Sequence, residues 1–315
     1  MLIDSRHIES LLRRPGQPET PVKLDRINGE LRSVTSDELS YPVVLSQPVL
    51  IDFADSIISR DWFNLAHTDY SIIGHRQSLP RIIKSYLVGT SAICNENFRK
   101  FRNLIKSKQT SRPLLLMIGS ATRGIGTDIL YDDPDIDQIS FDVYPSPLTH
   151  FVADAHKIPL PDHSIDAVCI QAVLEHVLEP SVVVSEIFRV LKTDGLVYAE
   201  TPFMQQIHEG AYDFTRFTEL GHRWLWRNFA AIERGAMGGP GLSLFWAAKY
   251  FFRGLTRHRR LADILSAPFM IFGLFDRLIS RKYQIDGANG VYFLGKKSEG
   301  AADTNTIARQ YLGAQ

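Results

Sequence analysis

The segment FVADAHKIPLPDHSIDAVCIQAVLEHV, residues 151–177, contains two apolar runs joined by a short polar turn. The first run stops at Asp154-Ala155, and the second, IDAVCIQ, occupies residues 165–171. Short runs that are apolar at nearly every position are typical of strands buried on both faces of a parallel sheet. The segment therefore predicts two buried strands, each with polar residues just beyond its end.

Similar runs lie on both sides of this segment along the chain. They are PLLLMIG at 113–119, QISFD at 138–142 and LVYAET at 196–201. Helical or loop segments separate them, and strands that alternate with such crossovers indicate a doubly wound, mostly parallel α/β sheet. Sheets of this kind bind ligands just beyond the carboxyl ends of their strands. The functional site is therefore expected in the residues that follow each run.

Two of these strand ends carry candidate ligand-binding residues. After the first run, IGSATRGIG at 118–126 is a turn of small residues, which lets a ligand approach the backbone without meeting a Cβ atom. Asp142 lies about twenty residues beyond Gly119, where a carboxylate can accept hydrogen bonds from both hydroxyls of a ribose. Taken alone, each feature is also consistent with ordinary loop packing.

Together with these turns, the segment at 151–177 resembles the class I S-adenosylmethionine-dependent methyltransferases, in particular the branch that often acts on small molecules and glycan precursors. The resemblance covers about residues 113–233, and EIFRVLKTDGLVYAETP at 186–202 looks like the helix, turn and fifth strand of that family. It implies a seven-stranded Rossmann-like sheet, S-adenosylmethionine as the cofactor, and methyl transfer to a small-molecule or glycan-type acceptor.

The resemblance also implies which residues hold the cofactor. In that family, an Asp-Ala pair binds the adenine, the carboxylate to the amino group and the backbone N–H to a ring nitrogen; here the pair is Asp154 and Ala155. The cofactor-binding residues expected in this chain are Gly119, Ser120, Ala121, Asp142, Val143, Asp154, Ala155 and Gln171.

The glycine turn departs from the family pattern at two positions. Met117 stands where an acidic residue usually ends the first strand, and Ala121 replaces the middle of three glycines. Either the backbone around Ser120 and Arg123 binds the amino group of the cofactor, or the cofactor site is weakened. The alternative to an enzyme is therefore a non-catalytic binding or scaffold protein with the methyltransferase fold. A nicotinamide-dependent enzyme is disfavoured, because only Gly119 is well placed for such a site.

The segment TPFMQQIHEGAYDFTRFTELGHR, residues 201–223, follows the fifth strand and resembles acceptor-side loops of this methyltransferase branch. If the acceptor is a hydroxyl, a base must take its proton, and His208 is the first candidate because imidazole has an ordinary pKa of ~6.5. Asp213 is expected to orient His208 or to replace it, and a purely structural hydrogen-bond network is the alternative. Glu175 and His176 are interpreted as structural. The expected acceptor-binding residues are Gln205, Gln206, Tyr212 and Arg216.

The chain divides into four zones. Residues 1–56 form a small strand-rich accessory region, weakly similar to a small, often zinc-binding domain that accompanies some methyltransferases, although here without its cysteines. Residues 57–112 are expected to form a helical connector. Residues 113–297 are the predicted methyltransferase domain, with a helical lid insertion at 238–285. The polar tail at 298–315 is expected to be disordered.

Composition limits the remaining function classes. Lys plus Arg (35) balance Asp plus Glu (35), and no basic stripe interleaves with aromatic residues, so nucleic-acid binding is not expected. The two cysteines do not form a CxxC pair, so we expect neither a disulfide framework nor a bound metal, and a cytoplasmic location. No secretory or membrane-spanning segment is recognised. The oligomeric state is left open.

Two apolar stretches within 242–279 are joined by the basic segment TRHRR. One interpretation is a lid that covers the acceptor site and packs on the core. The other is peripheral contact with a membrane, because basic residues beside an apolar, aromatic face favour the interface. Contact with a membrane would suit a lipid-linked or glycan acceptor.

Overall fold

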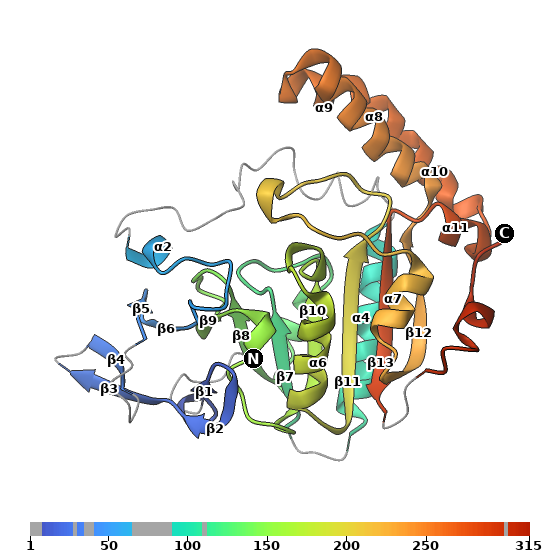
Figure 1. Ribbon diagram of the computed structural model, residues 1–315. Coiled ribbons are helices and arrows are strands. Elements are labelled where there is room, and N and C mark those ends of the chain that lie inside the picture. Colours follow the sequence, from blue (N-terminus) through green and yellow to red (C-terminus); the bar gives the residue numbers. More distant parts are fainter. Residues whose placement is uncertain (1–7, 28–29, 35–40, 65–89, 109–111, 299–301) are drawn as a thin grey trace.

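A nine-stranded sheet forms the centre of the computed structural model, which describes residues 8–27, 30–34, 41–64, 90–108, 112–298 and 302–315. The strand order is β12-β13-β11-β10-β7-β8-β9-β6-β5 (Figure 1). The strands are β5 (Val43–Val44), β6 (Gln47–Leu50), β7 (Leu114–Ile118), β8 (Asp137–Asp142), β9 (Phe151–Ala153), β10 (Ile165–Gln171), β11 (Leu191–Pro202), β12 (Phe229–Gly238) and β13 (Gly290–Lys297).

Strands β6 to β11 of this sheet run parallel to one another, and β13 lies antiparallel between β11 and β12. From β7 the chain proceeds to β8 and β9 on one side, and then returns to β10 and β11 on the other. This reversal opens a crevice beyond the carboxyl ends of β7 and β10. The doubly wound, mostly parallel sheet predicted from the apolar runs is confirmed.

Helices cover both faces of the sheet. Helix α4 (Thr90–Lys106) buries Cys94, Phe98, Phe101 and Ile105, whose spacing puts them on one side of the helix. Phe98 and Phe101 pack against Tyr198 of β11. On the other face lie α6 (Pro180–Val190) and α7 (Glu219–Leu225) (Figure 1). The Trp226 ring, just beyond α7, stacks on Phe293 of β13. Two apolar layers therefore hold the sheet.

The N-terminal region extends this sheet. Strand β6 pairs parallel to β9 and antiparallel to β5, so the seven strands implied by the resemblance gain two more at one edge. The region also contains two hairpins, β1 (Arg13–Arg14) with β2 (Gln17–Pro21) and β3 (Lys23–Ile27) with β4 (Glu30–Val34). The expected connector at 57–112 includes α2 (Asp61–Asn64) and α4; its residues 65–89 and 109–111 lie outside the described part.

A helical insertion joins β12 to β13 and rises above the carboxyl ends of the strands (Figure 1). It comprises α8 (Pro240–Thr256), α9 (Arg259–Ser266), η4 (Ala267–Ile271), α10 (Phe272–Phe275), η5 (Asp276–Leu278) and α11 (Arg281–Asp286). The Asp276 carboxylate accepts hydrogen bonds from the backbone N–H groups of Gly239, Gly241 and Leu242, and so fixes the start of α8. No helix among the described residues is long and apolar enough to cross a membrane.

The prediction of a disordered tail is wrong for residues 302–315. They contain η6 (Ile307–Gln310) and pack against α7 and β12. Arg223 donates to the Gln310 side chain at 3.0 Å, and Arg234 donates to the Gln310 carbonyl. The small, polar composition indicated disorder, but it did not reveal that arginines elsewhere in the chain would bind this segment.

Candidate functional site

A cavity of about 940 Å³ lies beyond the carboxyl ends of the central strands, within the size range of pockets that enclose small ligands. Asp142 and Asp154 line this one cavity, together with residues from the turn after β7 and the loop after β11. The predicted site residues that line it are Gly119, Ser120, Asp142, Val143, Asp154, Ala155, Gln171, Gln205, His208 and Tyr212.

The turn after β7 depends on glycine. Gly119 has a φ of +75°, and a Cβ atom there would lie 2.1 Å from Cγ2 of Val173. A Cβ atom at Gly124, which the sequence analysis did not select, would lie 1.7 Å from Oε1 of Gln171, so a larger residue there would require the Gln171 side chain to move. Ala121 is buried with no positive φ, and its N–H donates to Asp142 at 2.9 Å. The alanine therefore fits the turn and acts through its backbone.

Asp142 is fixed at the cavity wall by backbone donors. Its two oxygens accept hydrogen bonds from the N–H groups of Ala121 (2.9 Å) and Val143 (2.7 Å). Burial raises the pKa of Asp142 to about 6, although these donors oppose the shift. The carboxylate is held in one orientation and keeps lone pairs with which it can accept further hydrogen bonds.

Asp154 is held by side chains. Its oxygens accept hydrogen bonds from the Ser56 hydroxyl and from Nδ1 of His156, both at 2.5 Å. Burial alone would raise the pKa of Asp154, but the hydrogen bonds from His156 and Ser56 outweigh it and the pKa is lowered. Ser56, absent from the predicted site, comes from the region before α2. The N-terminal region thus completes the wall of the cavity at this point.

Glu200, near the end of β11, is a buried acid that the sequence analysis missed. It accepts hydrogen bonds from the Tyr198 hydroxyl and from Nε2 of Gln171, the latter at 2.7 Å, and lines the cavity. Burial raises its pKa. Oε1 of Gln171 is buried without a hydrogen-bond partner in the described part of the chain. The available signal was an acid inside the otherwise apolar run LVYAET.

The strand register places Glu200 on the same face of the sheet as Met117. Met117, Cys169 and Tyr198 are neighbours across β7, β10 and β11, and Gln171 and Glu200 form the next row on that face, two residues nearer the strand ends. Position 117 of β7 thus lacks a carboxylate, but Glu200 supplies one on the same face, one row nearer the strand ends and two strands away in β11.

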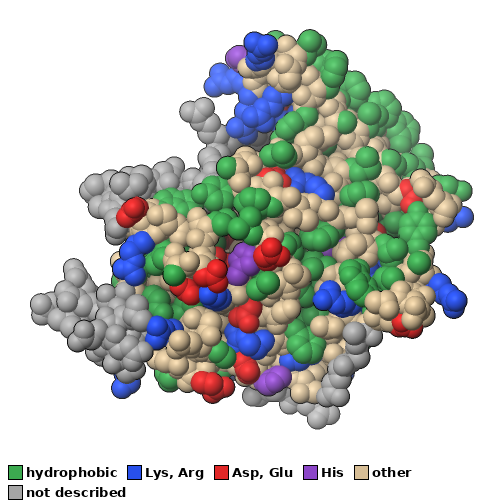
Figure 2. Space-filling model, in the orientation of Figure 1, with side chains coloured by type: hydrophobic (Ala, Val, Ile, Leu, Met, Phe, Trp, Pro, Cys, Tyr) green, Lys and Arg blue, Asp and Glu red, His purple; other side chains and the backbone are tan. Residues whose placement is uncertain are grey.

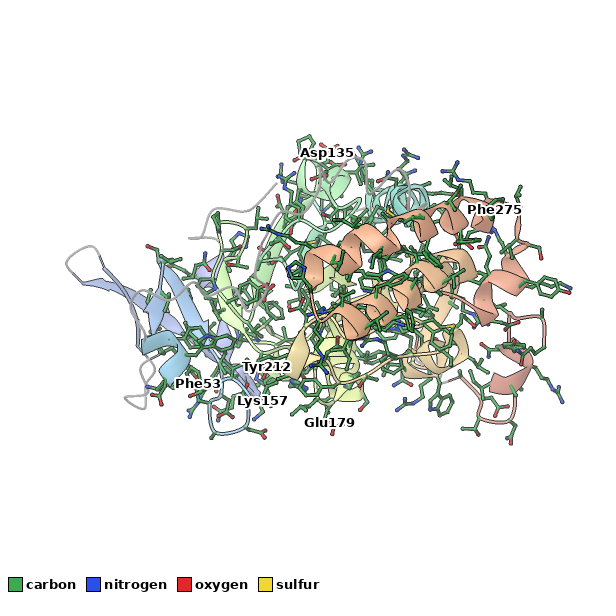
Figure 3. The ribbon with its side chains drawn as sticks, turned by 90° about the horizontal axis from the view of Figure 1, so that it is seen from above. Phe53, Asp135, Lys157, Glu179, Tyr212 and Phe275 are labelled. Atoms are coloured by element: carbon green, nitrogen blue, oxygen red, sulfur yellow. The ribbon has the colours of Figure 1, made fainter. Side chains whose placement is uncertain are left out.

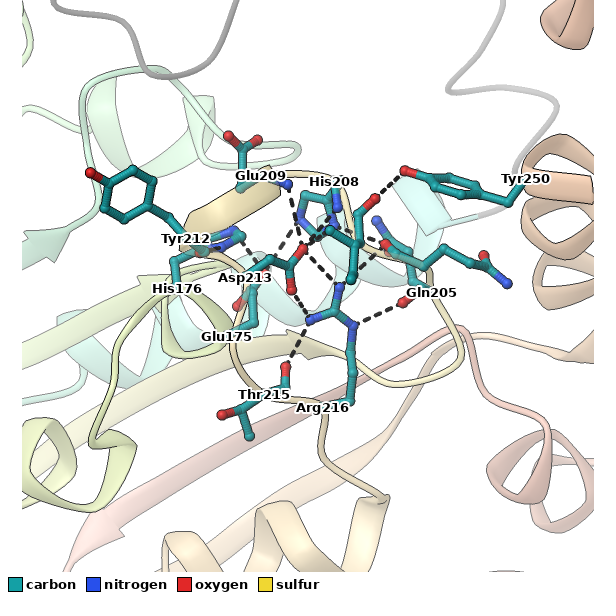
Figure 4. A network of polar contacts seen from close by, with 12 residues as sticks. Glu175, His176, Gln205, His208, Glu209, Tyr212, Asp213, Thr215, Arg216 and Tyr250 are labelled. Atoms are coloured by element: carbon teal, nitrogen blue, oxygen red, sulfur yellow. Dashed lines mark hydrogen bonds and ion pairs between the residues drawn. The ribbon is translucent and has the colours of Figure 1, made fainter. Parts of the chain in front are cut away.

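At the other end of the cavity, Glu175 and His176 of η2 (Leu174–His176) face His208 (Figure 4). Glu175 is completely buried, and neither carboxylate oxygen has a hydrogen-bond partner in another described residue. Nε2 of His176 lies 3.6 Å and Nε2 of His208 lies 3.9 Å from Oε1 of Glu175. Burial raises the pKa of Glu175 to about 8 and lowers that of His176.

Asp213 and Arg216 form a clasp behind His208 (Figure 4). Asp213 accepts a hydrogen bond from the backbone N–H of His208 at 2.8 Å, and Arg216 donates to both Asp213 oxygens. Burial would raise the pKa of Asp213, but Arg216 outweighs it and lowers the value to about 2. Arg216 also donates to the carbonyls of Gln205 and Gln206.

Three of the expected site residues lie away from the large cavity. Gln206, Asp213 and Arg216 line a separate cavity of about 450 Å³, so they do not face the large one. Asp213 binds the His208 backbone and Arg216, and Arg216 binds carbonyls of its own loop. The catalytic role of Asp213 and the acceptor-binding role of Arg216 stay predictions. The polar residues were predicted to contact the acceptor because nothing in the sequence shows that they bind one another.

Tyr212 and the insertion enclose the same end. The Tyr212 ring stacks on Trp62 with 6.2 Å between ring centres, and Figure 3 shows it on the N-terminal side of the insertion helices. Leu242, Phe245 and Trp246 of α8 line the cavity from the other side. This end of the cavity is therefore mostly apolar apart from the groups around His208.

Comparison with protein families finds one match: residues 131–199, from the end of α5 (Asp128–Tyr131) into β11, match a family model described as "Methyltransferase domain". Comparison with curated proteins finds no significant match.

Several solved structures are similar in fold. A putative sarcosine dimethylglycine methyltransferase from Galdieria sulphuraria is 14% identical, with a TM-score of 0.43 over 66% of this chain and 86% of that one. A phosphoethanolamine N-methyltransferase 2 from Haemonchus contortus is 15% identical, with a TM-score of 0.43 over 77% and 61%. A methyltransferase dependent on S-adenosylmethionine from Archaeoglobus fulgidus is 13% identical, with a TM-score of 0.43 over 69% and 98%. The assignment of the fold rests on the strand order and register described above.

Proposed function

We propose that the protein, an S-adenosylmethionine-dependent methyltransferase, transfers the methyl group to a hydroxyl oxygen of a small-molecule or glycan-type acceptor. The observation that carries this proposal is that a single cavity joins Gly119, Asp142 and Asp154 at one end to His208 at the other. The cofactor supplies an already activated methyl group, so the protein has mainly to align the acceptor and exclude water.

We assign the cofactor to the end with the carboxylates. Asp142 is positioned to accept hydrogen bonds from the ribose hydroxyls, and the backbone of Ala155 to bind the adenine. Asp154 contributes less through its carboxylate than the resemblance implied, because Ser56 and His156 already engage it. Glu200 and Oε1 of Gln171, which has no hydrogen-bond partner among the described residues, offer acceptors for the amino group of the cofactor.

We assign the acceptor to the end with His208. Its ring Nδ1 lies 3.3 Å from the Gln206 carbonyl and 3.5 Å from an Asp213 oxygen, both of which can only accept, so Nδ1 carries the hydrogen. Nε2 is then left with a lone pair to activate a hydroxyl. Tyr212 and the apolar residues of α8 reduce the access of water to this end.

The outer face of the insertion supports peripheral contact with a membrane that presents the acceptor. Apolar side chains run along this face, and basic side chains gather at its tip (Figure 2). Within the insertion, the side chains of Phe251, Leu255, Ile264 and Leu278 are each more than 60% exposed, and exposed apolar surface of this kind favours contact with a partner or a membrane. Co-sedimentation with anionic vesicles tests this location: vesicle binding that persists after Phe251→Ser and Ile264→Ser substitutions would contradict it.

The chemistry is tested by incubating the protein with S-adenosylmethionine carrying a ¹³C-labelled methyl group and a panel of hydroxylated small molecules and glycan fragments. We expect a labelled methyl ether, detected by mass spectrometry. The ether should be absent with Asp142→Ala and present with Asp194→Asn, a matched change at an exposed aspartate on the opposite end of the sheet. A labelled methyl group on nitrogen or carbon, with none on oxygen, would contradict the assignment of a hydroxyl acceptor.

A further inference from the structure

Three side chains that the methyl-transfer site does not fully use converge at the acceptor end of the cavity. Glu175, His176 and His208 each present one ligand atom, and these atoms lie within 4.8 Å of one another. Glu175 and His176 come from the turn after β10, whereas His208 comes from the loop after β11. All three line the large cavity, and Figure 4 shows them side by side at one place in the fold.

Glu175 gives independent evidence that something binds here. The Glu175 carboxylate is fully buried and has no hydrogen-bond partner in another described residue. An ionised carboxylate in such a place is strongly unfavourable, and native proteins rarely leave one in that state. The nearest guanidinium, that of Arg216, is already bound to Asp213. A cation between Glu175 and the two imidazoles would remove this cost.

The two histidines are oriented as metal ligands usually are. Nδ1 of His176 lies 2.7 Å from the Tyr212 carbonyl and must donate to it, which leaves the lone pair on Nε2, the atom nearer Glu175. Nδ1 of His208 faces the Gln206 carbonyl and the Asp213 carboxylate, which leaves the Nε2 lone pair in the same way. A backbone carbonyl or carboxylate behind the far ring nitrogen is the common outer shell of metal-bound histidine.

We propose that Glu175, His176 and His208 bind a divalent transition-metal ion. Two imidazole nitrogens and one carboxylate oxygen suit Zn²⁺, Mn²⁺, Fe²⁺ or Co²⁺ and leave coordination positions open towards the cavity. Ligand bonds of about 2.1 Å place ligand atoms roughly 3.0–3.4 Å apart. The two histidine-to-Glu175 separations, 3.6 and 3.9 Å in the protein, must shorten by about 0.2–0.9 Å, and all three ligand atoms already lie within 4.8 Å of one another.

The role of this ion rests on the proposed function. A hydroxyl bound at an open position has a lowered pKa, so its O–H bond breaks and the proton passes to water. The oxygen keeps the electron pair, which forms the new bond to the methyl carbon as the carbon–sulfur bond breaks. His208 then acts as a ligand, and the ion replaces it as the group that activates the acceptor.

The test is a titration of the full, untagged chain, stripped of metal with a chelator, with Co²⁺ alone. We expect one ion per chain and visible absorption from a nitrogen- and oxygen-ligated cobalt site. His176→Ala, His208→Ala and Glu175→Gln should each weaken binding at least tenfold, whereas His258→Ala, a change at an exposed histidine that begins α9, should not. Binding of S-adenosylhomocysteine by each variant checks that it is folded.

The outcomes separate the two proposals. No cobalt binding by the folded chain, or equal binding by His208→Ala and His258→Ala, would overturn the metal site. Cobalt binding that requires all three residues supports the site, even if no acceptor is methylated. If the unmodified chain binds no S-adenosylhomocysteine, the result would instead count against the proposed function alone.

Discussion

The two ends of the cavity treat their buried acids differently. At the cofactor end, Asp142, Asp154 and Glu200 all accept hydrogen bonds from nearby backbone or side-chain donors. At the acceptor end, Glu175 is more deeply buried and has no such partner in the described structure. The three acids at the cofactor end are therefore held in fixed positions, which suits a ligand that needs hydrogen-bond acceptors there. At the acceptor end, Glu175 has no positive group bound to it in the described structure, which is why we infer a cation there.

Among substitutions at the two ends of the cavity, we expect His208→Ala to have the largest effect. His208→Ala should lower the single-turnover rate of methyl transfer about a hundredfold to ten-thousandfold, because it removes the group that activates the hydroxyl, directly or through the ion. The affinity for S-adenosylhomocysteine should stay within about twofold. A variant that loses cofactor affinity and keeps its rate would place His208 at the wrong end of the cavity.

The next effect concerns the pH dependence of stability. Burial raises the pKa of Glu175 to about 8 in the folded state, so between its ordinary value and pH 8 the folded chain binds more protons than the unfolded chain. The stabilising effect of this protonation is complete at low pH, and the free energy of unfolding falls as the pH rises through that window.

Glu175→Gln removes this contribution. In the presence of a chelator, we compare the free energy of unfolding of the variant with that of the unmodified chain at pH 5 and at pH 8. Between these pH values, the difference should shift in favour of the variant by on the order of 2–4 kcal/mol. Urea unfolding at both pH values measures these free energies. The titration of Asp142 contributes equally to both chains and so cancels in the difference. Saturating Zn²⁺ should reverse the order. Parallel pH profiles for the two chains would contradict an unpartnered Glu175.

A smaller effect is expected at Glu200. Glu200→Gln should weaken binding of S-adenosylhomocysteine about tenfold, because a neutral amide replaces the acid that lies on the same sheet face as Met117, where the usual carboxylate is absent. Glu233→Gln, at an acid that pairs with Lys100 outside the cavity, is the matched control and should bind normally. Equal affinities of the two variants, measured by calorimetry, would mean that the backbone of the glycine turn binds the amino group by itself.

The smallest effect is expected at Ser56. Ser56→Ala removes one hydrogen bond to Asp154 but leaves His156 in place, so the affinity for S-adenosylhomocysteine should fall about two- to fivefold. Ser59→Ala is the control, since the Ser59 hydroxyl only caps α2. A loss of more than about fiftyfold would show that the N-terminal region contributes far more to the cofactor site than one hydrogen bond.

The central sheet could be predicted because each buried strand is a continuous apolar run that ends at a polar turn. Pairing of β6 with β9 could not, because these short strands lie about a hundred residues apart and nothing local encodes their partnership. The same limit hid Glu200, whose position relative to Met117 follows only from the register of three strands.

The candidate site divides in the same way. Gly119 and Asp142 could be selected from the sequence because Gly119 directly follows one apolar strand and Asp142 ends the next. From their polarity, Asp213 was assigned to catalysis and Arg216 to the acceptor, but the two bind each other. Glu175 and His176 were interpreted as structural because His208, which completes their cluster, lies some thirty residues away on another loop. Charge and hydrogen-bonding capacity can be read from a sequence, whereas the partner that satisfies them cannot.

The most direct test of the account is calorimetric titration of the folded chain with S-adenosylhomocysteine. We predict one molecule bound per chain, with affinity reduced about tenfold or more by Asp142→Ala and unchanged by Asp194→Asn. A folded chain that releases no heat at millimolar ligand, or that binds equally well without the Asp142 carboxylate, would contradict the placement of the cofactor in this cavity.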